Sequence, residues 1–264
     1  LQAGEVLYST LANAAEIAKS KFIMVIDEWD APIREHPACM DAYLNLLRSL
    51  FKNSGVTAKV FAAAYMTGIL PIKKQKGQSA VSDFREFTML RPGSFAEYVG
   101  FTEEEVKGLC EEYNIDFLEM KRWYDGYELK NVGPVYNPNS VMNAVENGEF
   151  DSYWSQSSAA DNLLDFIRCD VDGLRKTIVE LMGGVETEID TTGYNNDLTY
   201  TTKNAALTML VHLGYLAYSQ ETKTVRIPNE EIRLEFARTI REDRNAETMK
   251  RVKESDQLIM DTIH

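Results

Sequence analysis

The sequence predicts an α/β fold that begins with a parallel sheet and continues into a helical region and a winged-helix-like C-terminal unit. Three observations lead to this prediction. Helical and strand-like apolar patterns alternate over residues 4–70, as in strands joined by helical crossovers. Helix-capping signals dominate residues 100–185. A helix, a hairpin and another helix are expected between residues 202 and 243.

The first elements follow from hydrophobic periodicity. Residues 4–20 repeat apolar side chains at helical spacing and predict a helix. The continuous apolar run Phe22–Ile26 contains β-branched residues and predicts a strand buried on both faces of a parallel sheet. Residues 40–53 predict a second helix, closed by Asn53 and Gly55, and the apolar run from Val60 predicts a second strand.

Helix starts are marked by capping residues in the middle of the chain. Thr102 and Glu105 form a capping-box pattern, Asp116 can cap the next helix, and Asn137 precedes a proline suited to a first helical turn. Two further starts are expected at Ser158 and Asp172, the latter helix ending at Gly183 and Gly184. Beyond them, we expect a helix closed by Gly214, two short strands around the turn 221–223, and a helix over 229–243.

Composition limits the classes of function. The chain has 264 residues and a formal net charge of -13, which disfavours broad nucleic-acid binding because phosphate contacts require Lys and Arg. The basic stretch 73–76 is either a solvated loop or a local phosphate contact.

Cys39, Cys110 and Cys169 are far apart, as are the three histidines, so we expect free thiols in a reducing cytoplasm and no Cys/His metal site. The sequence contains neither an apolar run long enough to span a membrane nor a signal peptide.

Three acids directly follow the first predicted strand. Ligands of open parallel sheets bind beyond the carboxyl ends of the strands, where Asp27, Glu28 and Asp30 are expected. A strand that delivers Asp and then Glu resembles the Walker B element of P-loop NTPases. There the Asp holds magnesium, usually through water, and the Glu orients or deprotonates the attacking water. The alternatives are a loop of solvated acids and a DExD helicase motif.

The second predicted strand also ends in a polar residue. Thr67 lies where a neighbouring strand of such NTPases carries a residue that senses the γ-phosphate, although a plain strand end or helix cap gives the same pattern. Arg34, Arg85 and Arg91 are candidates for an arginine finger, and pairing with surface acids is the alternative for each.

Seven sequence blocks occur in a recognisable order. They are "VIDEWDAPI", "YMTGILPIKK", "EYVGFTEEEV", "MKRWYDGYEL", "VYNPNSV", "LVHLGYLAY" and "RIPNEEIRLEF". Over about residues 20–240 the chain thereby resembles the bacterial AAA-ATPase-like family, whose members commonly carry a C-terminal PD-(D/E)XK-type nuclease domain.

The resemblance implies roles for single residues. Asp27 becomes the magnesium-associated acid, Glu28 the water-activating acid and Thr67 a sensor-like residue. Asp30 matches the family's second acid, which we place among the nucleotide-binding residues without a stated role. In the block Trp123–Tyr127 we expect a structural role, with Gly126 at a positive φ and Asp125 bonded to neighbouring backbone amides.

The chain departs from the family at both ends. No G-x-x-x-x-G-K-[ST] loop occurs in the 264 residues, and nothing after residue 240 provides the acids and Lys of a nuclease. We therefore expect a piece of a longer protein, in which ATP and magnesium bind only when the missing phosphate loop is present.

The expected organisation is a partial P-loop NTPase core over 1–95, a helical lid-like region over 96–190, a winged-helix-like unit over 191–245, and a linker or terminal helix over 246–264. The expected function is an ATPase-like domain that couples ATP binding or hydrolysis to a downstream effector, with a nuclease domain in cis as a candidate. Nucleic-acid binding and homo-oligomerisation are left open. The alternative is a non-catalytic scaffold or protein-interaction module that retains the fold.

Overall fold

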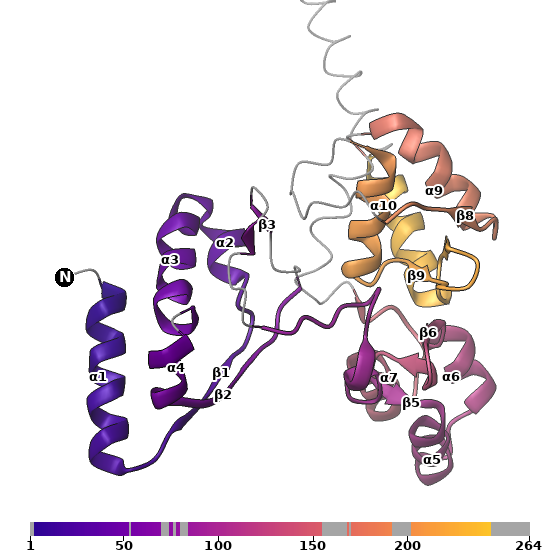
Figure 1. Cartoon of the computed structure of the whole chain (residues 1–264). Coiled ribbons are helices and arrows are strands. Elements are labelled where there is room, and N and C mark those ends of the chain that lie inside the picture. The colour runs from indigo at the N-terminus through magenta and orange to yellow at the C-terminus, as the bar shows by residue number, and fades with distance from the viewer. Residues whose placement is uncertain are drawn as a thin grey trace, which may run out of the picture. The chain divides into compact units, whose positions relative to one another are not determined.

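A computed structural model describes residues 3–52, 54–69, 74–75, 78–79, 84–154, 168, 170–191 and 202–243 of the chain. The chain forms two compact units (Figure 1). The first contains the described residues up to Thr88, and the second contains those from Met89 onward. The regions expected at 96–190 and 191–245 therefore fall in one unit.

The first unit contains one parallel strand pair and its helices. The elements are α1 (Ala3–Ala18), β1 (Phe22–Ile26), α2 (Ala31–Glu35), the 3-10 helix Pro37–Cys39, α3 (Met40–Phe51), α4 (Ser54–Val60), β2 (Phe61–Met66), β3 (Lys74–Gln75) and β4 (Gln78–Ser79). β1 and β2 pair in parallel with Ile26 opposite Met66, and β3 pairs with β4 in antiparallel fashion. The predictions of α1, β1, α3 and β2 are confirmed. Gly55 lies inside α4 rather than closing α3.

The prediction that β1 is buried on both faces is wrong for the described part of the chain. One face, with Phe22, Met24 and Ile26, packs on a core that includes Leu44 and Leu47 of α3. On the other face Ile23 is 71% exposed, Val25 is 65% exposed, and Tyr65 of β2 is 48% exposed. The alternation arises because the described helices cover only one side of the β1–β2 pair.

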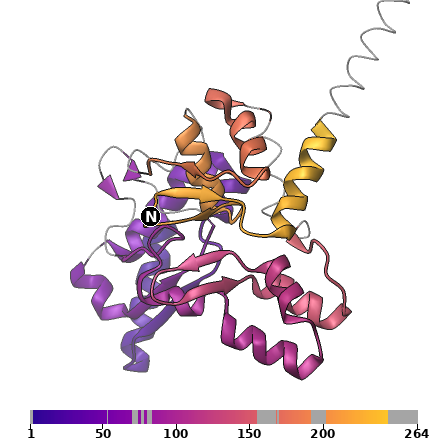
Figure 2. The ribbon, with the colours of Figure 1, turned by 90° about the vertical axis from the view of Figure 1, so that its right-hand side faces the viewer.

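The second unit begins with a 3-10 helix at Gly93–Tyr98. It continues with β5 (Phe101–Thr102), α5 (Glu103–Tyr113), α6 (Phe117–Tyr124), β6 (Tyr127–Leu129), β7 (Gly133–Tyr136), α7 (Pro138–Asn147), the 3-10 helix Val171–Gly173, α9 (Leu174–Met182), β8 (Thr187–Glu188), α10 (Lys203–His212), β9 (Ala217–Tyr218) and β10 (Thr224–Arg226). Residues 230–243 form a helix after β10, drawn in yellow in Figure 2.

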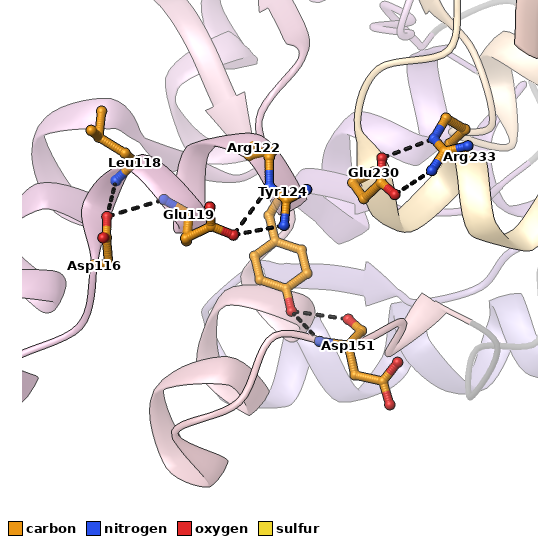
Figure 3. A network of polar contacts seen from close by, with 8 residues as sticks. All are labelled: Asp116, Leu118, Glu119, Arg122, Tyr124, Asp151, Glu230 and Arg233. Atoms are coloured by element: carbon orange, nitrogen blue, oxygen red, sulfur yellow. Dashed lines mark hydrogen bonds and ion pairs between the residues drawn. The ribbon is translucent and has the colours of Figure 1, made fainter. Parts of the chain in front are cut away.

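Three predicted helix starts are confirmed by their side-chain bonds. Thr102 and Glu105 form the complete capping box of α5. Asp116 accepts hydrogen bonds from the backbone N–H groups of Leu118 and Glu119, as Figure 3 shows. Asn137 caps α7 in the same way, with Pro138 in its first turn. Each cap satisfies backbone donors that the helix itself leaves free.

Two predictions for this region need correction. The expectation of a mainly helical segment misses the antiparallel sheet of order β5-β7-β6. Asp172 does not cap α9; it lies at φ 50° in the preceding 3-10 helix, and α9 begins at Leu174. The helix expected at Ser158 lies outside the described residues.

The C-terminal elements agree with prediction in type and order. α10 is followed by Gly214 at φ 82°, and β9 and β10 form the expected antiparallel hairpin. The sheet gains a third strand because β8 pairs with the other edge of β10.

The block Trp123–Tyr127 has the structural role that we expected. Gly126 has a φ of 118° and Asp125 Oδ1 accepts a hydrogen bond from the Gly126 N–H, so both details are confirmed. The Tyr124 hydroxyl lies between two backbone groups of Asp151, donating to its carbonyl at 2.9 Å and accepting from its N–H at 3.2 Å (Figure 3).

The same block is fastened to the segment that follows β10. Arg226 Nη2 donates to the Gly126 carbonyl at 2.9 Å, and Asn229 Nδ2 donates to the Asp125 carbonyl at 2.8 Å. Nearby, the Tyr127 hydroxyl donates to the Gly214 carbonyl at 2.5 Å. Side chains of one sequence block therefore bond to backbone carbonyls of another, and the Gly126 backbone lies close to that of Pro228, which explains the glycine and the asparagine.

A buried carboxylate joins the last helix to the unit. Glu231 is 1% exposed, and its Oε1 accepts hydrogen bonds from the Ser140 hydroxyl and from the N–H groups of Tyr153 and Trp154. Glu235, 5% exposed, accepts from the Ser152 hydroxyl. Burial raises the pKa of Glu231 to about 7 despite these donors.

Candidate nucleotide site at the ends of β1 and β2

The carboxyl ends of β1 and β2 stay hydrogen-bonded beyond the strands. The Thr67 N–H donates to the Ile26 carbonyl at 2.9 Å, and the Trp29 N–H donates to the Thr67 carbonyl at 2.8 Å. Parallel strands end at the same edge of a sheet, so the residues that follow them are brought together. The two strand ends form one framework, on which the candidate side chains are placed.

Asp27 and Thr67 are in direct contact, although they are 40 residues apart in the chain. The Thr67 hydroxyl donates to Asp27 Oδ1, and the same oxygen accepts from the Glu28 N–H at 3.0 Å. Asp27 is exposed and Thr67 is half-buried. The structure therefore brings together the two residues assigned to magnesium and to γ-phosphate sensing.

Glu28 lies beside this pair on strained backbone. Its φ is 48°, in the left-handed region that residues other than glycine rarely occupy. Its side chain is 60% exposed and accepts a hydrogen bond from Arg34 Nη2 at 3.4 Å. Strained backbone concentrates at functional sites, where the surrounding structure enforces it.

Asp30 is placed differently from the other three candidates. It is fully buried, with Oδ2 bonded to Arg34 Nε at 2.9 Å and Oδ1 bonded to the Ile69 N–H at 3.2 Å. A buried carboxylate of this kind is stable only when it is paired and hydrogen-bonded. Asp30 therefore ties the loop after β1 to the end of β2.

Gly68 allows the two strand ends to approach closely. A Cβ atom at this position would lie 2.4 Å from Trp29 Cδ1 and 2.5 Å from Asp30 Oδ1. Trp29 is 5% exposed and belongs to the core of the first unit, so it cannot move freely. A side chain at position 68 would force the loop after β1 away from β2.

We expect Gly68→Ala to lower the free energy of unfolding by about 1–3 kcal/mol through this overpacking. Urea denaturation of wild type and variant measures the difference. Gly108→Ala is the control, because nothing lies within 4 Å of its Cβ position and alanine is the better helix former. Equal stability of the two variants would contradict the close contact at Gly68.

The oxygen atoms at the strand ends suit a hard divalent cation. Carboxylate and hydroxyl oxygens are typical ligands or water partners of Mg²⁺, which keeps most of its own water shell. No group of three or more His, Cys, Asp or Glu side chains that could hold a metal ion exists among the described residues. The described side chains at the strand ends therefore do not form a complete metal site by themselves.

Two further residues, Arg34 and Gly68, shape the site in ways that the sequence motifs do not predict. Arg34 was one of three equivalent arginine-finger candidates, although its spacing of four from Asp30 on a helix is a signal for pairing. Gly68 has no sequence signal beyond its place directly after Thr67. Of the other arginines, Arg85 lies over the ring of Phe87, 5.0 Å from its centroid. Of the basic stretch 73–76, residues 73 and 76 lie outside the described residues.

Comparison with known proteins gives one weak similarity. A segment of 169 residues, 62% of this chain, is 22% identical to an "Uncharacterized protein in vnfD 5'region" of Azotobacter chroococcum mcd 1. The matched segment spans 31% of that relative, so the chain corresponds to about a third of its length. No protein-family model and no solved structure matches the chain. Of the helices described here, none is both long enough and apolar enough to cross a membrane.

Proposed function

We propose that the first unit is part of the ATP-hydrolysing core of a bacterial P-loop NTPase, in which nucleotide binding or hydrolysis controls an attached effector. The observation that carries the proposal is the contact between Asp27 and Thr67 at adjacent parallel strand ends, with Glu28 exposed beside them. The resemblance of the seven sequence blocks supports the same function and suggests a nuclease domain in cis as the effector.

The proposal gives each residue a task in the reaction. Bound ATP with magnesium would supply the phosphoryl group and its charge-neutralising cation. Asp27 would orient the magnesium-bound water shell, and Thr67 would hold Asp27 and contact the terminal phosphate. Glu28 would accept a proton from the attacking water or orient it.

The proposal requires a phosphate loop from outside these 264 residues, because no G-x-x-x-x-G-K-[ST] sequence occurs within them. The exposed face of β1 and β2 agrees with this requirement. Parallel sheets are normally covered by helices on both faces, whereas Ile23 and Val25 are largely exposed. Further strands and helices of an NTPase core would cover them.

Replacing Glu28 by Gln tests the proposal in the longest protein that contains this chain. We expect the turnover number for ATP to fall about a hundredfold, because general base catalysis contributes on the order of 10²–10⁴. Binding of a non-hydrolysable ATP analogue should be unchanged. Glu35→Gln removes an exposed acid of α2 and serves as the matched control. Unchanged turnover in Glu28→Gln would refute the assigned role.

The second candidate function is a scaffold or protein-interaction module without catalysis. The exposed apolar face of Ile23, Val25 and Tyr65 favours it, since contiguous apolar surface often marks an interaction site. A longer protein that neither binds nor hydrolyses ATP, yet forms a stable complex through this face, would establish this alternative.

A further inference from the structure

Arg34 of α2 connects two acids that differ strongly in exposure. Its Nε donates to Asp30 Oδ2 at 2.9 Å, and its Nη2 donates to Glu28 Oε2 at 3.4 Å. The Asp30 side chain is fully buried, the Arg34 side chain is 18% exposed, and the Glu28 side chain is 60% exposed. The guanidinium therefore spans from the interior of the first unit to the surface where the candidate site lies.

The buried end of this connection is fixed at several points. Asp30 accepts from Arg34 and from the Ile69 N–H, so it joins α2 to the end of β2. Separating a buried carboxylate from its cation is costly, because the remaining charge is left unpaired in a medium of low polarity. The Nε end of Arg34 is consequently held in place.

The exposed end acts on Glu28. A guanidinium is planar and rigid, so fixing Nε also fixes the direction of the Nη2 donor. The left-handed backbone of Glu28 already limits where its carboxylate can lie, and the bond from Arg34 restricts it further. This bond uses one of the roughly four acceptor sites of the carboxylate, so Glu28 can also accept from a second donor.

We propose that Arg34 is a positioning residue that orients the Glu28 carboxylate toward its water, and that Asp30 is the anchor of Arg34. This inference rests on the proposed ATPase function. It gives Asp30 a role that does not involve the nucleotide, and it separates Arg34 from an arginine finger, which reaches the phosphates directly and acts independently of Glu28.

The first experiment uses Arg34→Lys in the longest protein that contains this chain. Lysine keeps the charge beside Asp30, so the fold should survive, but its single ammonium group lacks the fork that reaches both acids. We expect the kcat for ATP to fall about tenfold with an unchanged KM. Arg122→Lys is the matched control, because Arg122 pairs with an acid three residues earlier on the exposed face of α6.

The double variant decides between positioning and direct contact. If Arg34 acts through Glu28, adding Arg34→Lys to Glu28→Gln will cause no further loss of the residual turnover. A further tenfold loss in the double variant would overturn the inference and identify Arg34 as a group that acts on the phosphates. Restoration of turnover by mixing Arg34→Lys with Glu28→Gln subunits would overturn it as well.

The second experiment needs no nucleotide. Nitrogen-15 NMR of the chain measures rotation of the Arg34 guanidinium about its Nε–Cζ bond, which is slow when both ends are held. We expect rotation to be about tenfold faster in Glu28→Ala than in wild type. Equal rotation rates in Glu28→Ala and wild type would show that Glu28 does not hold the Arg34 guanidinium. Slow rotation in wild type, together with full turnover in Glu28→Gln, would instead refute the proposed ATPase role of Glu28 and leave the connection intact.

Discussion

Replacing Gly126 by alanine is expected to lower the free energy of unfolding of the second unit by about 2–6 kcal/mol. The strained backbone accounts for about 1–3 kcal/mol, because Gly126 has a φ of 118°. Overpacking accounts for about another 1–3 kcal/mol, because the new Cβ would lie 2.1 Å from the Pro228 carbonyl oxygen. The loss is large compared with the ~5–15 kcal/mol of a typical domain.

The clash cannot be relieved by a small movement. The backbone of Pro228 stands between Arg226 and Asn229, and both of these side chains bond to the 125–126 backbone, at 2.9 Å and 2.8 Å respectively. Moving either segment away would break these bonds and withdraw the N-terminal end of the last helix. The unit must therefore accept strain or lose the attachment.

Two other glycines separate the causes. Gly133→Ala tests a positive φ alone, because its φ is 88° and nothing lies within 4 Å of its Cβ position. Gly108→Ala tests neither effect and should be slightly stabilising in α5. In urea denaturation, the free energy of unfolding should be lowest for Gly126→Ala, intermediate for Gly133→Ala and highest for Gly108→Ala. If Gly126→Ala is no less stable than Gly133→Ala, the close approach of Gly126 to Pro228 is absent.

Replacing Glu231 by Gln is expected to change how the stability of the second unit depends on pH. Burial raises the pKa of Glu231 to about 7 from an ordinary value of 4.5. Between these values the folded state binds more protons than the unfolded state, so this residue's contribution is present at low pH and is lost as pH rises through 7. The shift corresponds to about 3 kcal/mol.

His212 has the opposite effect over almost the same range. Burial lowers its pKa to about 4 from 6.5, so its contribution is present above pH 6.5 and is lost as pH falls toward 4. In the wild type the two contributions largely cancel between pH 4.5 and 6.5. In the variant Glu231→Gln only His212 contributes, so the free energy of unfolding should fall as pH falls from 6.5 toward 4.

Urea denaturation at several pH values tests this pair. The free energy of unfolding of wild type minus that of Glu231→Gln should rise by about 3 kcal/mol between pH 7.5 and 4.5. Gln keeps an oxygen that can accept from Ser140, Tyr153 and Trp154, so the fold should be retained. Glu128→Gln, at an exposed position of β6, is the matched control. A constant difference across this range would contradict a raised pKa for Glu231.

Elements whose signals are local could be predicted from the sequence. The strand Phe22–Ile26 and the caps Thr102, Asp116 and Asn137 each depend on a few neighbouring residues, and all were found at the expected positions. The β6–β7 hairpin was missed because a strand of three residues is too short to show a period. The available signal was Asn131 in the turn and Gly133 at the start of β7, both of which have a positive φ.

The chemistry of buried acids could not be predicted in the same way. Glu231 and Glu235 belong to a helix rich in charged residues, yet both are buried in the second unit. Their partner hydroxyls belong to Ser140 and Ser152, 91 and 83 residues earlier in the chain. At the candidate site, the sequence suggested Asp27 and Thr67 as neighbours, but the burial of Asp30 and its bond to the end of β2 depend on tertiary structure.

The attachment of the Trp123–Tyr127 block to the segment after β10 has a consequence for folding. Gly126 and Arg226 are 100 residues apart, so their contact closes a very long loop. Contacts of such high sequence separation slow folding, because the entropy of loop closure is lost before the contact forms. During synthesis, helices α5 to α7 leave the ribosome well before residues 226–236. They must therefore wait without the contacts that Arg226, Asn229 and Glu231 make, and we expect chaperone binding to be concentrated in this interval.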